Sequence, residues 1–585
     1  MHSKPKNDST NGIDGKPPGQ PSRSSRRNAL KQAAALLGGA SANLILADAR
    51  SAVGAEARRP ETVGDRVAAR GGLGVVETNS GRVAGYVRNG IFTFKGIPYA
   101  DTGGGDNRFR PPIKPKPWAG VRSSRQYGPV CPQGARAGWA HDEEAFMFTW
   151  DDGVPGEDCL RLNVWTPGLR DGKKRPVMVW LHGGGFFAGS GQELRAYDGE
   201  NLARRGDVVV VSLNHRLSIF GYLDLSSYGA QFEGAGNLGM LDIVAALEWV
   251  RDNVANFGGD PGSVTIFGQS GGGGKVGTLM AMPAAKGLFH RAIVESGSMS
   301  RLATPEIAQG VADQVVAELG LNRATVDRIR SMPAQQLVEA SEKVLARRRA
   351  VLVGGIPDFR NLVDALGFAP VVDGKILPAH PFDPRATETG ADIPMIIGST
   401  LNEFVSAIDH PEYEDMTESQ VEERVRQLYR DRTSAVLAAF RRRTPHAKPF
   451  DLYSRIGAAS VRASAIKQAL AQSAAGRAKV YLYWFTWQTP ILDGRPRAFH
   501  CAELPFVFDN TDRCETMTGG GPQARTLAGL MSQAWSHFAR TGDPNHPQMP
   551  RWDPVSKSAL PTMIFDNKSE CVISPDAEEQ ASVGT

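Results

Sequence analysis

The stretch VTIFGQSGGGGKVGTLM, residues 264–280, places one serine and four consecutive glycines between a strand-forming run and a helix-like segment. Glycine disfavours a helix by about 1 kcal/mol relative to alanine, so glycines at a helix start need a physical reason. The run GQSGG at 268–272 matches G-x-S-x-G, in which small residues permit a strained turn that exposes a serine oxygen at the top of a sheet. Ser270 is therefore a candidate nucleophile.

Two other glycine-rich devices compete for the same residues. A phosphate-binding loop, G-x-x-x-x-G-K-[ST], would use Gly274 and Lys275, but two required positions, including the metal-binding Ser or Thr, hold other residues. A dinucleotide fingerprint, G-x-G-x-x-G, fits 272–277, yet it should open directly after the strand, and it begins five residues past Phe267. Both alternatives are weaker than the serine turn.

A second glycine run precedes the serine. The apolar strand-type run 177–181 is followed by His182-Gly183-Gly184-Gly185. An attacking serine creates a negative oxygen that backbone N–H groups can stabilise, and glycine lets the backbone approach that oxygen to about 3 Å. The order of the two runs predicts that this loop and Ser270 serve one site.

The elements that must position these residues are strands alternating with helices. Near-continuous Val, Ile and Leu runs, separated by helix-type patterns such as 238–253, predict a mostly parallel sheet covered by helices on both faces. Residues 74–100 predict hairpins, and 303–350 and 415–475 predict helical excursions that form one wall of a pocket. The predicted buried strands are 175–181, 207–213, 264–267 and 291–295.

Composition restricts the partners. The chain has 585 residues, of which 41% are apolar, so it can fill a large core. Its net charge of +5 comes mainly from residues 1–57, since the rest holds 59 basic and 58 acidic residues. Electrostatics therefore gives no reason to expect a nucleic-acid partner. No uncharged apolar run reaches 18 residues, so no membrane span is expected.

The N-terminal segment has its own pattern. A polar stretch leads to Arg26-Arg27, an uncharged run follows at 32–47, and Ala-x-Ala sites lie at 47–49 and 55–57. This pattern is similar to a bacterial twin-arginine export signal, which predicts a protein exported to the periplasm or secreted. The predicted organisation is a signal and tail at 1–57, a linker at 58–71, a single α/β domain at 72–576 and a C-terminal tail at 577–585.

Longer stretches extend the pattern over most of the chain. With them, the sequence resembles the type B carboxylesterases, the esterase and cholinesterase-like branch of the α/β hydrolases. The resemblance implies an α/β-hydrolase fold and the hydrolysis of small-molecule esters without a metal or cofactor. The matching stretches are FKGIPYA at 94–100, EDCLRLNVWTP at 157–167, WLHGGGFFAGSG at 180–191, NHRLSIFGYL at 214–223 and the run from Gly236 to Gly272.

The resemblance also implies roles for single residues. The family triad runs Ser, Glu, His in chain order, so Ser270 would be the nucleophile, Glu403 in IGSTLNEF the acid and His500 in AFHCAELPFVF the base. Phe404 replaces a small residue usual after the acid, which leaves Asp409 and Glu414 open for that role. Chain order by itself leaves further histidines open as the base: His410, His446, His537 and His546.

Further residues follow from the same resemblance. The oxyanion N–H donors would be Gly184, Gly185 and Gly271, and Ser296 would steady the acid, although a plain turn explains Ser296 equally well. Gln269 is neutral where relatives that bind quaternary ammonium have an acidic residue, which predicts poor hydrolysis of choline esters.

The cysteines predict a disulfide, and no residue pattern completes a metal site. All five cysteines follow the signal, which fits an oxidising destination. The family's first disulfide loop implies a Cys131–Cys159 bond, which would stabilise the fold by about 3 kcal/mol. His500 and Glu503 stand three residues apart, as zinc ligands sometimes do, but no H-E-x-x-H or C-x-x-C motif completes a site, so no metal is expected.

The sequence leaves a second class of function open, that of a protein without catalytic activity. The same family includes adhesion and storage proteins that keep the hydrolase fold without catalysis, so the fold by itself does not guarantee activity. The presence of a serine, an acid and a histidine in the right order favours an enzyme.

Overall fold

The computed structural model describes residues 66–101, 104, 107–134, 142–349 and 367–584. The predicted export signal at 1–57 and the first part of the predicted linker, up to residue 65, lie outside these residues. Where a C-terminal tail was expected, the structure has a helix, α16 (Ala577–Val583).

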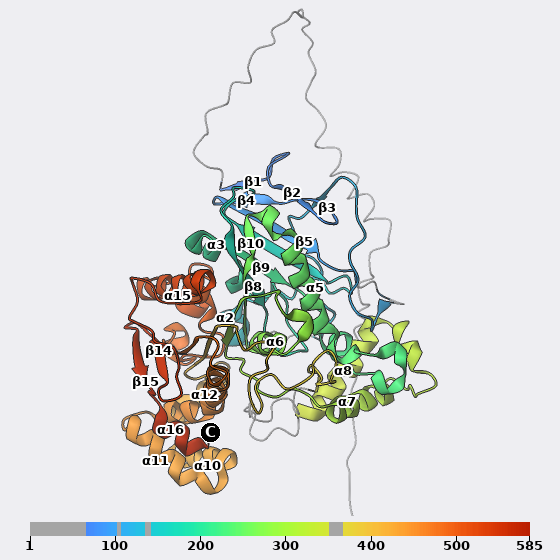
Figure 1. The fold of residues 1–585 in the computed structure, drawn as a ribbon. Helices are drawn as coiled ribbons and strands as arrows, with labels where there is room; N and C mark the ends of the chain where they lie inside the picture. Colours follow the sequence, from blue (N-terminus) through green and yellow to red (C-terminus); the bar gives the residue numbers. More distant parts are fainter. Residues whose placement is uncertain (1–65, 102–103, 105–106, 135–141, 350–366, 585) are drawn as a thin grey trace, which may run out of the picture. The chain divides into compact units, whose positions relative to one another are not determined.

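A large sheet runs through the described part of the chain (Figure 1). Its central strands, from β9 to β14, are parallel, and antiparallel strands continue it on both sides. The prediction of a mostly parallel sheet is confirmed. In spatial order the strands are β1 (Val67–Ala68), β4 (Tyr86–Arg88), β5 (Ile91–Pro98), β7 (Arg161–Thr166), β9 (Val209–Leu213), β8 (Arg175–Leu181), β10 (Gly259–Gln269), β11 (Arg291–Glu295), β12 (Met395–Thr400), β13 (Val480–Phe485), β14 (Pro561–Phe565) and β15 (Glu570–Ile573).

The two predicted hairpins are present near the start of the described residues. β2 (Val75–Thr78) pairs antiparallel with β3 (Gly81–Ala84), and β6 (Val121–Ser123) completes a small second sheet. β4 and β5 form the other hairpin, at the turn Asn89-Gly90. Both turns carry the Asn and Gly residues that favour such a connection.

Helices cover both faces of the large sheet, because its central strands are apolar on both sides. Along β8, Val177, Val179 and Leu181 belong to one buried cluster, while Met178 and Trp180 belong to another. This alternation follows from the two-residue period of a strand. The first cluster packs against α5 (Leu238–Asn253) and α6 (Gly271–Leu279), and the second against α3 (Glu200–Gly206) and α15 (Pro522–Thr541).

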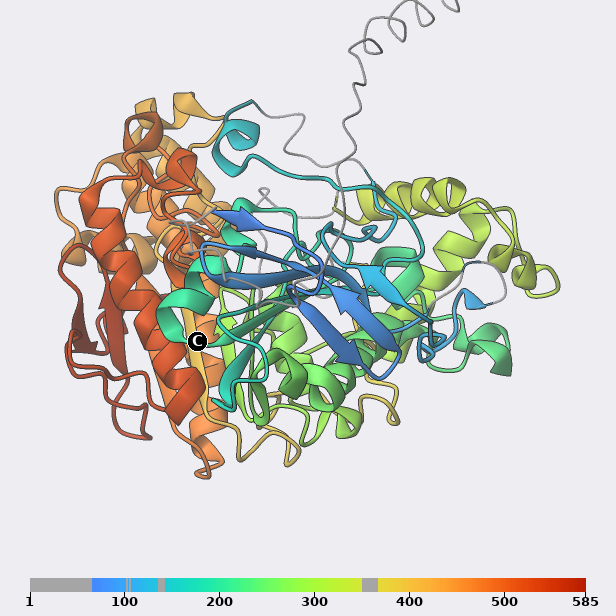
Figure 2. The same ribbon diagram turned by 90° about the horizontal axis from the view of Figure 1, so that it is seen from above.

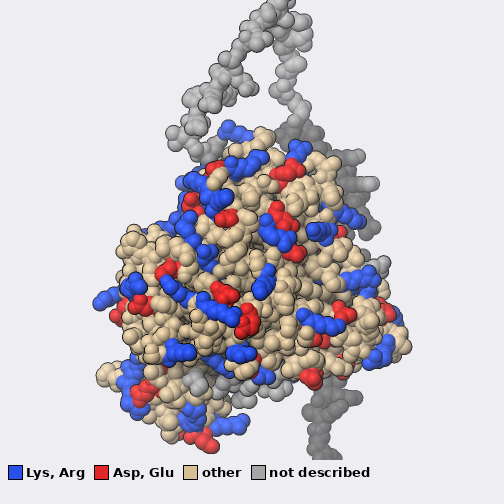
Figure 3. All heavy atoms as spheres, in the orientation of Figure 1, with Lys and Arg blue, Asp and Glu red and all other residues tan. Residues whose placement is uncertain are grey.

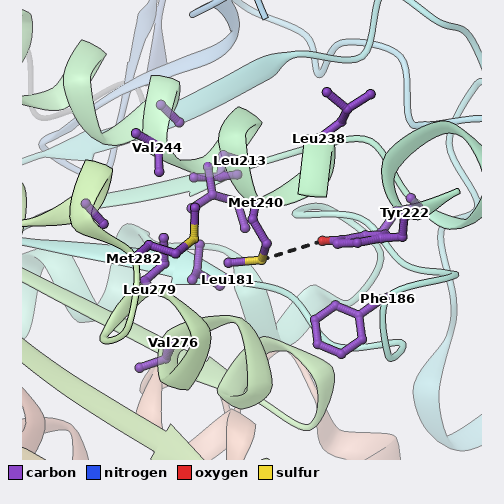
Figure 4. Packing of buried hydrophobic residues seen from close by; sticks show 14 of the residues in the cluster. Leu181, Phe186, Leu213, Tyr222, Leu238, Met240, Val244, Val276, Leu279 and Met282 are labelled. Atoms are coloured by element: carbon purple, nitrogen blue, oxygen red, sulfur yellow. Dashed lines mark hydrogen bonds between the residues drawn. The ribbon is translucent and has the colours of Figure 1, made fainter. Parts of the chain in front are cut away.

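Figure 4 shows the first cluster from close by. Val276 and Leu279 of α6 belong to the same buried cluster as Leu181 of β8, and so do Phe186 and Tyr222. α6, the helix that follows Ser270, therefore rests on a well-packed layer that holds its N-terminus in place.

The helical excursions are present, at opposite sides of the sheet in both Figure 1 and Figure 2. That they line a pocket stays a prediction. None of the helices in the described ranges is both long and apolar enough to cross a bilayer. The excursions contain α7 (Pro305–Glu318), α8 (Ala334–Arg349), α10 (Glu418–Tyr429), α11 (Thr433–Arg443) and α12 (Pro449–Ala474), and the shorter helices elsewhere are α2 (Asp142–Phe148), α4 (Ser218–Tyr222), α13 (Leu504–Val507) and α14 (Glu515–Thr518).

Candidate active site

Ser270 lies in a sharp turn between β10 and α6, at the centre of the sheet. Its backbone has φ 56° and ψ −126°, a conformation that a non-glycine residue adopts only under strain. Its N–H donates to the carbonyl oxygen of Glu295 at 2.8 Å, so the neighbouring strand β11 holds the turn in this conformation. The side chain is partly exposed. The turn thus presents a serine hydroxyl at the end of a central strand.

The glycines after Ser270 allow a very close approach of two backbones. A Cβ placed on Gly271 would lie 2.2 Å from the oxygen and 2.5 Å from the nitrogen of Gly185, and one on Gly272 would lie 1.9 Å from the oxygen of Leu181. Any side chain at these positions would push the loop after β8 away from α6. The glycine run therefore brings the predicted oxyanion loop against the serine turn.

This contact gathers the predicted N–H donors. Gly184 and Gly185 have φ of 75° and 62°, which glycine adopts at little cost. Neither N–H donates a hydrogen bond to another backbone group of the described residues. The N–H of Gly271 belongs to the first residue of α6, where a helix leaves its amides unpaired. The arrangement leaves donors free to meet a negative oxygen at Ser270.

Glu403 is a fully buried carboxylate with three hydrogen-bond donors. Its Oε1 accepts from Ser296 Oγ at 2.8 Å and from the N–H of Thr400 at 2.7 Å. Its Oε2 lies 2.6 Å from Nδ1 of His500. The sequence pointed to Ser296 as a partner of the acid, and the structure places it there. Thr400 was missed, because a backbone N–H leaves no signal in the residue pattern.

The backbone also joins the segments that carry the acid and the histidine. The N–H of His500 donates to the carbonyl oxygen of Glu403 at 2.8 Å, and Glu403 and Phe499 form an isolated β-bridge. Asn402 adds two more hydrogen bonds, with Ala498. These contacts set the relative position of two segments that lie almost one hundred residues apart in the sequence.

Two neighbours contact the His500 ring. Gln269 Nε2 lies 3.0 Å from Nε2 of His500, and Cys501 Sγ donates to Gln269 Oε1 at 3.3 Å. The Phe404 ring lies against the imidazole with its centroid 3.8 Å away, and 40% of Phe404 is exposed. Within the described residues the ring bonds to Glu403 and Gln269, and no hydrogen bond joins it to Ser270. The Gln269 amide nitrogen lies close to both ring nitrogens, 3.0 Å from Nε2 and 3.3 Å from Nδ1.

The alternative acids have other partners. Both carboxylate oxygens of Asp409 accept from backbone N–H groups at the start of α2, namely those of Glu143 and Glu144. Glu414 pairs with Arg497 at 2.7 Å. Neither carboxylate contacts the His500 ring, so Glu403 is the acid that the geometry favours.

Three of the four alternative histidines, His410, His537 and His546, also contact groups other than Glu403. His410 lies 3.0 Å from Glu412 and is half exposed. The rings of His537 and His546 contact backbone carbonyl oxygens, those of Asp543 and Leu530. None of these rings contacts Glu403, so His500 is the base that the geometry favours.

Two further buried carboxyl groups lie near Glu403. Glu295 accepts a hydrogen bond from Trp535 Nε1 at 2.7 Å, and burial raises the pKa of Glu295 to about 8. Burial and the neighbouring carboxyl groups of Glu295 and Glu403 raise the pKa of Glu503 well above its usual value. At neutral pH Glu295 is therefore mostly protonated and adds little negative charge behind the acid. Sequence alone offered no signal for this burial.

Cys131 and Cys159 are buried next to each other as free thiols, so the structure does not contain the expected disulfide. The Cys131 thiol and burial raise the pKa of Cys159 well above its usual value. Cys131 Sγ accepts from the N–H of Leu217 at 3.2 Å. The two sulfurs interact, but no bond joins them.

Comparison with known proteins places the whole arrangement in one family. The carboxylesterase family profile matches residues 73–582. Para-nitrobenzyl esterase of Bacillus subtilis strain 168 is 35% identical over 511 residues, which cover 86% of this chain and 97% of that esterase. Phenmedipham hydrolase of Pseudarthrobacter oxydans is 33% identical over 517 residues, covering 87% and 96% of the two chains.

Solved structures of esterases resemble this chain over most of its length. An esterase from anaerobic Clostridium hathewayi, described as able to hydrolyse aliphatic aromatic polyesters, superposes with a TM-score of 0.75 at 35% identity and covers 88% of this chain and 98% of its own. A carboxylesterase of Geobacillus stearothermophilus gives a TM-score of 0.72 at 36% identity, with 87% and 99% covered. The α/β-hydrolase fold and the family resemblance predicted from sequence are thereby confirmed. The chain belongs to the carboxylesterase family and is an ester-hydrolysing enzyme.

Proposed function

We propose that the protein hydrolyses carboxylic esters through an acyl-enzyme on Ser270, with His500 as the general base and Glu403 as the acid that orients it. The observation that carries this proposal is the strained turn of Ser270, packed against the loop of Gly184 and Gly185 beside the His500–Glu403 hydrogen bond. A strained serine, free backbone donors and an oriented imidazole are what acyl transfer needs.

The first half-reaction uses the two nitrogens of His500 differently. Nδ1–H donates to Glu403, which leaves Nε2 as an acceptor for the proton of Ser270. Before that transfer, the ring must exchange its contact with Gln269 for one with the serine hydroxyl. Catalytic hydrogen bonds are often incomplete before substrate binds. As the imidazole gains the proton, the buried carboxylate of Glu403 stabilises the positive ring.

The negative oxygen of the tetrahedral intermediate would meet the N–H groups of Gly184, Gly185 and Gly271. Each such donor contributes about 3 kcal/mol to lowering the barrier. His500 then protonates the departing alcohol, which leaves the acyl group on Ser270. In the second half-reaction His500 removes a proton from water, which attacks the acyl group. His500 then returns the proton to the oxygen of Ser270 as the ester bond breaks and the acid leaves.

We infer a substrate class from the relatives and from the surroundings of the base. The named relatives act on a para-nitrobenzyl ester, on phenmedipham and on aliphatic aromatic polyesters. The exposed ring of Phe404, stacked on His500, offers an aromatic surface beside the reacting groups. We therefore propose neutral esters, with an aromatic ring in the acyl or alcohol part, as preferred substrates.

We also propose that the protein is exported from a bacterium through its twin-arginine segment, to the periplasm or the medium. An oxidising destination would let the adjacent thiols of Cys131 and Cys159 form a disulfide. Periplasmic or secreted protein should then contain one disulfide at these residues, as shown by peptide mass analysis with and without reductant. A replacement of Arg26-Arg27 by Lys-Lys should retain the protein in the cytoplasm.

The function is tested with wild type and Ser270→Ala. Wild type should release p-nitrophenol and benzyl alcohol from their esters, and Ser270→Ala should lose at least a thousandfold in kcat/KM. An organophosphate should add covalently to Ser270 of wild type and to no residue of the variant. A folded wild type that neither hydrolyses any ester nor accepts the organophosphate would favour the alternative of a catalytically silent binding or adhesion protein.

A further inference from the structure

Lys275 is a buried lysine that forms no ion pair with a carboxylate of the described residues. It stands in α6, five residues after Ser270, and its side chain is fully buried. Burial is the cause that lowers its pKa, to about 7. Lysine is rarely fully buried unless it is paired, because its removal from water is unfavourable. The contacts of its amine should therefore show what compensates for this burial.

Its contacts lie on the loop after β8. Lys275 Nζ donates to the carbonyl oxygen of His182 at 2.8 Å and to that of Gly183 at 3.4 Å. The Phe186 ring lies 5.7 Å from the same nitrogen. Val276 and Leu279 of the same helix, labelled in Figure 4, belong to the apolar cluster beside it. An amine in this environment has its polar contacts with the backbone of one loop.

The geometry of the peptide bond links this contact to the oxyanion site. The carbonyl of Gly183 and the N–H of Gly184 belong to one peptide unit, and the peptide is trans, since the one cis bond among the described residues is Asp383-Pro384. In a planar trans unit the two groups point in opposite directions. A donor that holds the Gly183 carbonyl therefore fixes the direction in which the Gly184 N–H points. Two groups lie at that oxygen, Lys275 Nζ at 3.4 Å and His182 Nδ1 at 3.1 Å.

We propose that Lys275 is a positioning residue of the oxyanion hole, which holds the carbonyls of His182 and Gly183 and so aims the N–H of Gly184 at the oxyanion. The inference rests on the proposed role of Ser270. Hydrogen bonding to the carbonyl also polarises the peptide unit and strengthens its N–H as a donor. Lys275 thus acts through the backbone of the loop after β8 and does not contact the substrate itself.

The test compares Lys275→Met, which keeps the length of the side chain but has no donor, with Lys286→Met as a matched control. Lys286 is exposed and lies eleven residues further along the chain. The assays are kcat and KM for a p-nitrophenyl ester, and the affinity of a trifluoromethyl ketone, whose adduct with the serine carries an oxyanion. The affinity of the matching secondary alcohol, which forms no adduct, reports ground-state binding.

For Lys275→Met we expect kcat/KM and the trifluoromethyl ketone affinity to fall tenfold or more together, while KM and the affinity of the alcohol change less than threefold. Lys275→Gln, which retains a donor, should recover part of the loss. Lys275→Leu, which also has no donor, serves as the test if the Met variant does not fold. Lys286→Met should match wild type. A folded Met or Leu variant within twofold of wild type in both measures, or one that loses alcohol and ketone affinity equally, overturns the proposal.

The outcome is separable from the proposed function. If wild type hydrolyses esters and Ser270 accepts an organophosphate, but Lys275→Met behaves like wild type, the role of Lys275 fails and the esterase mechanism stands. If wild type shows neither property, the mechanism fails first, and with it the role of Lys275.

Discussion

Removal of one hydroxyl, in Ser296→Ala, tests whether the hydrogen bonds of Glu403 serve catalysis. Ser296 Oγ donates to Oε1 of the carboxylate at 2.8 Å, opposite the oxygen that contacts His500. The variant leaves Thr400 N–H as the remaining donor to Oε1. The carboxylate then has more freedom to turn away from the imidazole when the ring becomes charged.

The size of the effect follows from the kind of bond. Hydrogen bonds to charged groups contribute about 1.5–3 kcal/mol, and a loss of 1.4 kcal/mol in the transition state slows a reaction about tenfold. Because Thr400 still holds the same oxygen, we expect the lower end, about a tenfold fall in kcat/KM for a p-nitrophenyl ester. KM should change little, since Ser296 lies behind the acid and not in the substrate's place.

Ser298→Ala is the matched control for this variant. Ser298 lies two residues further along the same segment, is buried, and its hydroxyl has no hydrogen-bond partner within the described residues. It should keep kcat/KM within twofold of wild type. The reasoning is refuted if Ser296→Ala is as active as wild type, or if both variants lose activity equally, because the loss would then reflect packing alone.

Three further predictions concern the elbow, the buried carboxyl groups and the substrate. Gly272→Ala should fail to fold or lose most activity, since its Cβ would lie 1.9 Å from a backbone oxygen. The control is Gly310→Ala, whose Cβ would have no atom within 4 Å, and in urea unfolding its free energy of unfolding should equal or exceed that of wild type. Glu295 ionises near pH 4.5 when unfolded and near 8 when folded, so the folded chain holds an extra proton between these values and its unfolding free energy falls as pH rises. Glu295→Gln should make that slope shallower, with Glu503 still contributing to it, and should gain a few kcal/mol at pH 9 in the same assay. An unchanged slope would contradict the pKa of Glu295. With neutral Gln269 before the nucleophile, a choline ester should react several-fold more slowly than a neutral ester of equal size, and equal rates would end that explanation.

The surface carries charged side chains of both signs. On the face drawn in Figure 3, basic and acidic side chains are interspersed and do not gather by sign. The face shown gives no reason to expect long-range steering of a charged substrate, which agrees with the proposal of neutral esters.

The sequence predicted the four central strands β8, β9, β10 and β11, because their side chains are buried on both faces and so form apolar runs. The predicted run 175–181 coincides with β8, 291–295 with β11, and 238–253 with α5. The other strands of the parallel centre, β12, β13 and β14, were not predicted as strands, nor were β15 and the helix α16. These elements form through pairing and packing with distant parts of the chain, which a local pattern does not contain.

The sequence by itself indicated the serine turn and the glycine run beside it, because G-x-S-x-G is a local pattern that can be recognised without the rest of the fold. The tertiary structure decided which acid faces His500, since Glu403, Asp409 and Glu414 differ in what they contact and not in their chemistry. It also decided that Glu295 and Lys275 are buried with shifted pKa values. Desolvation and hydrogen-bond geometry depend on residues hundreds of positions away, so they exist only once the chain has folded.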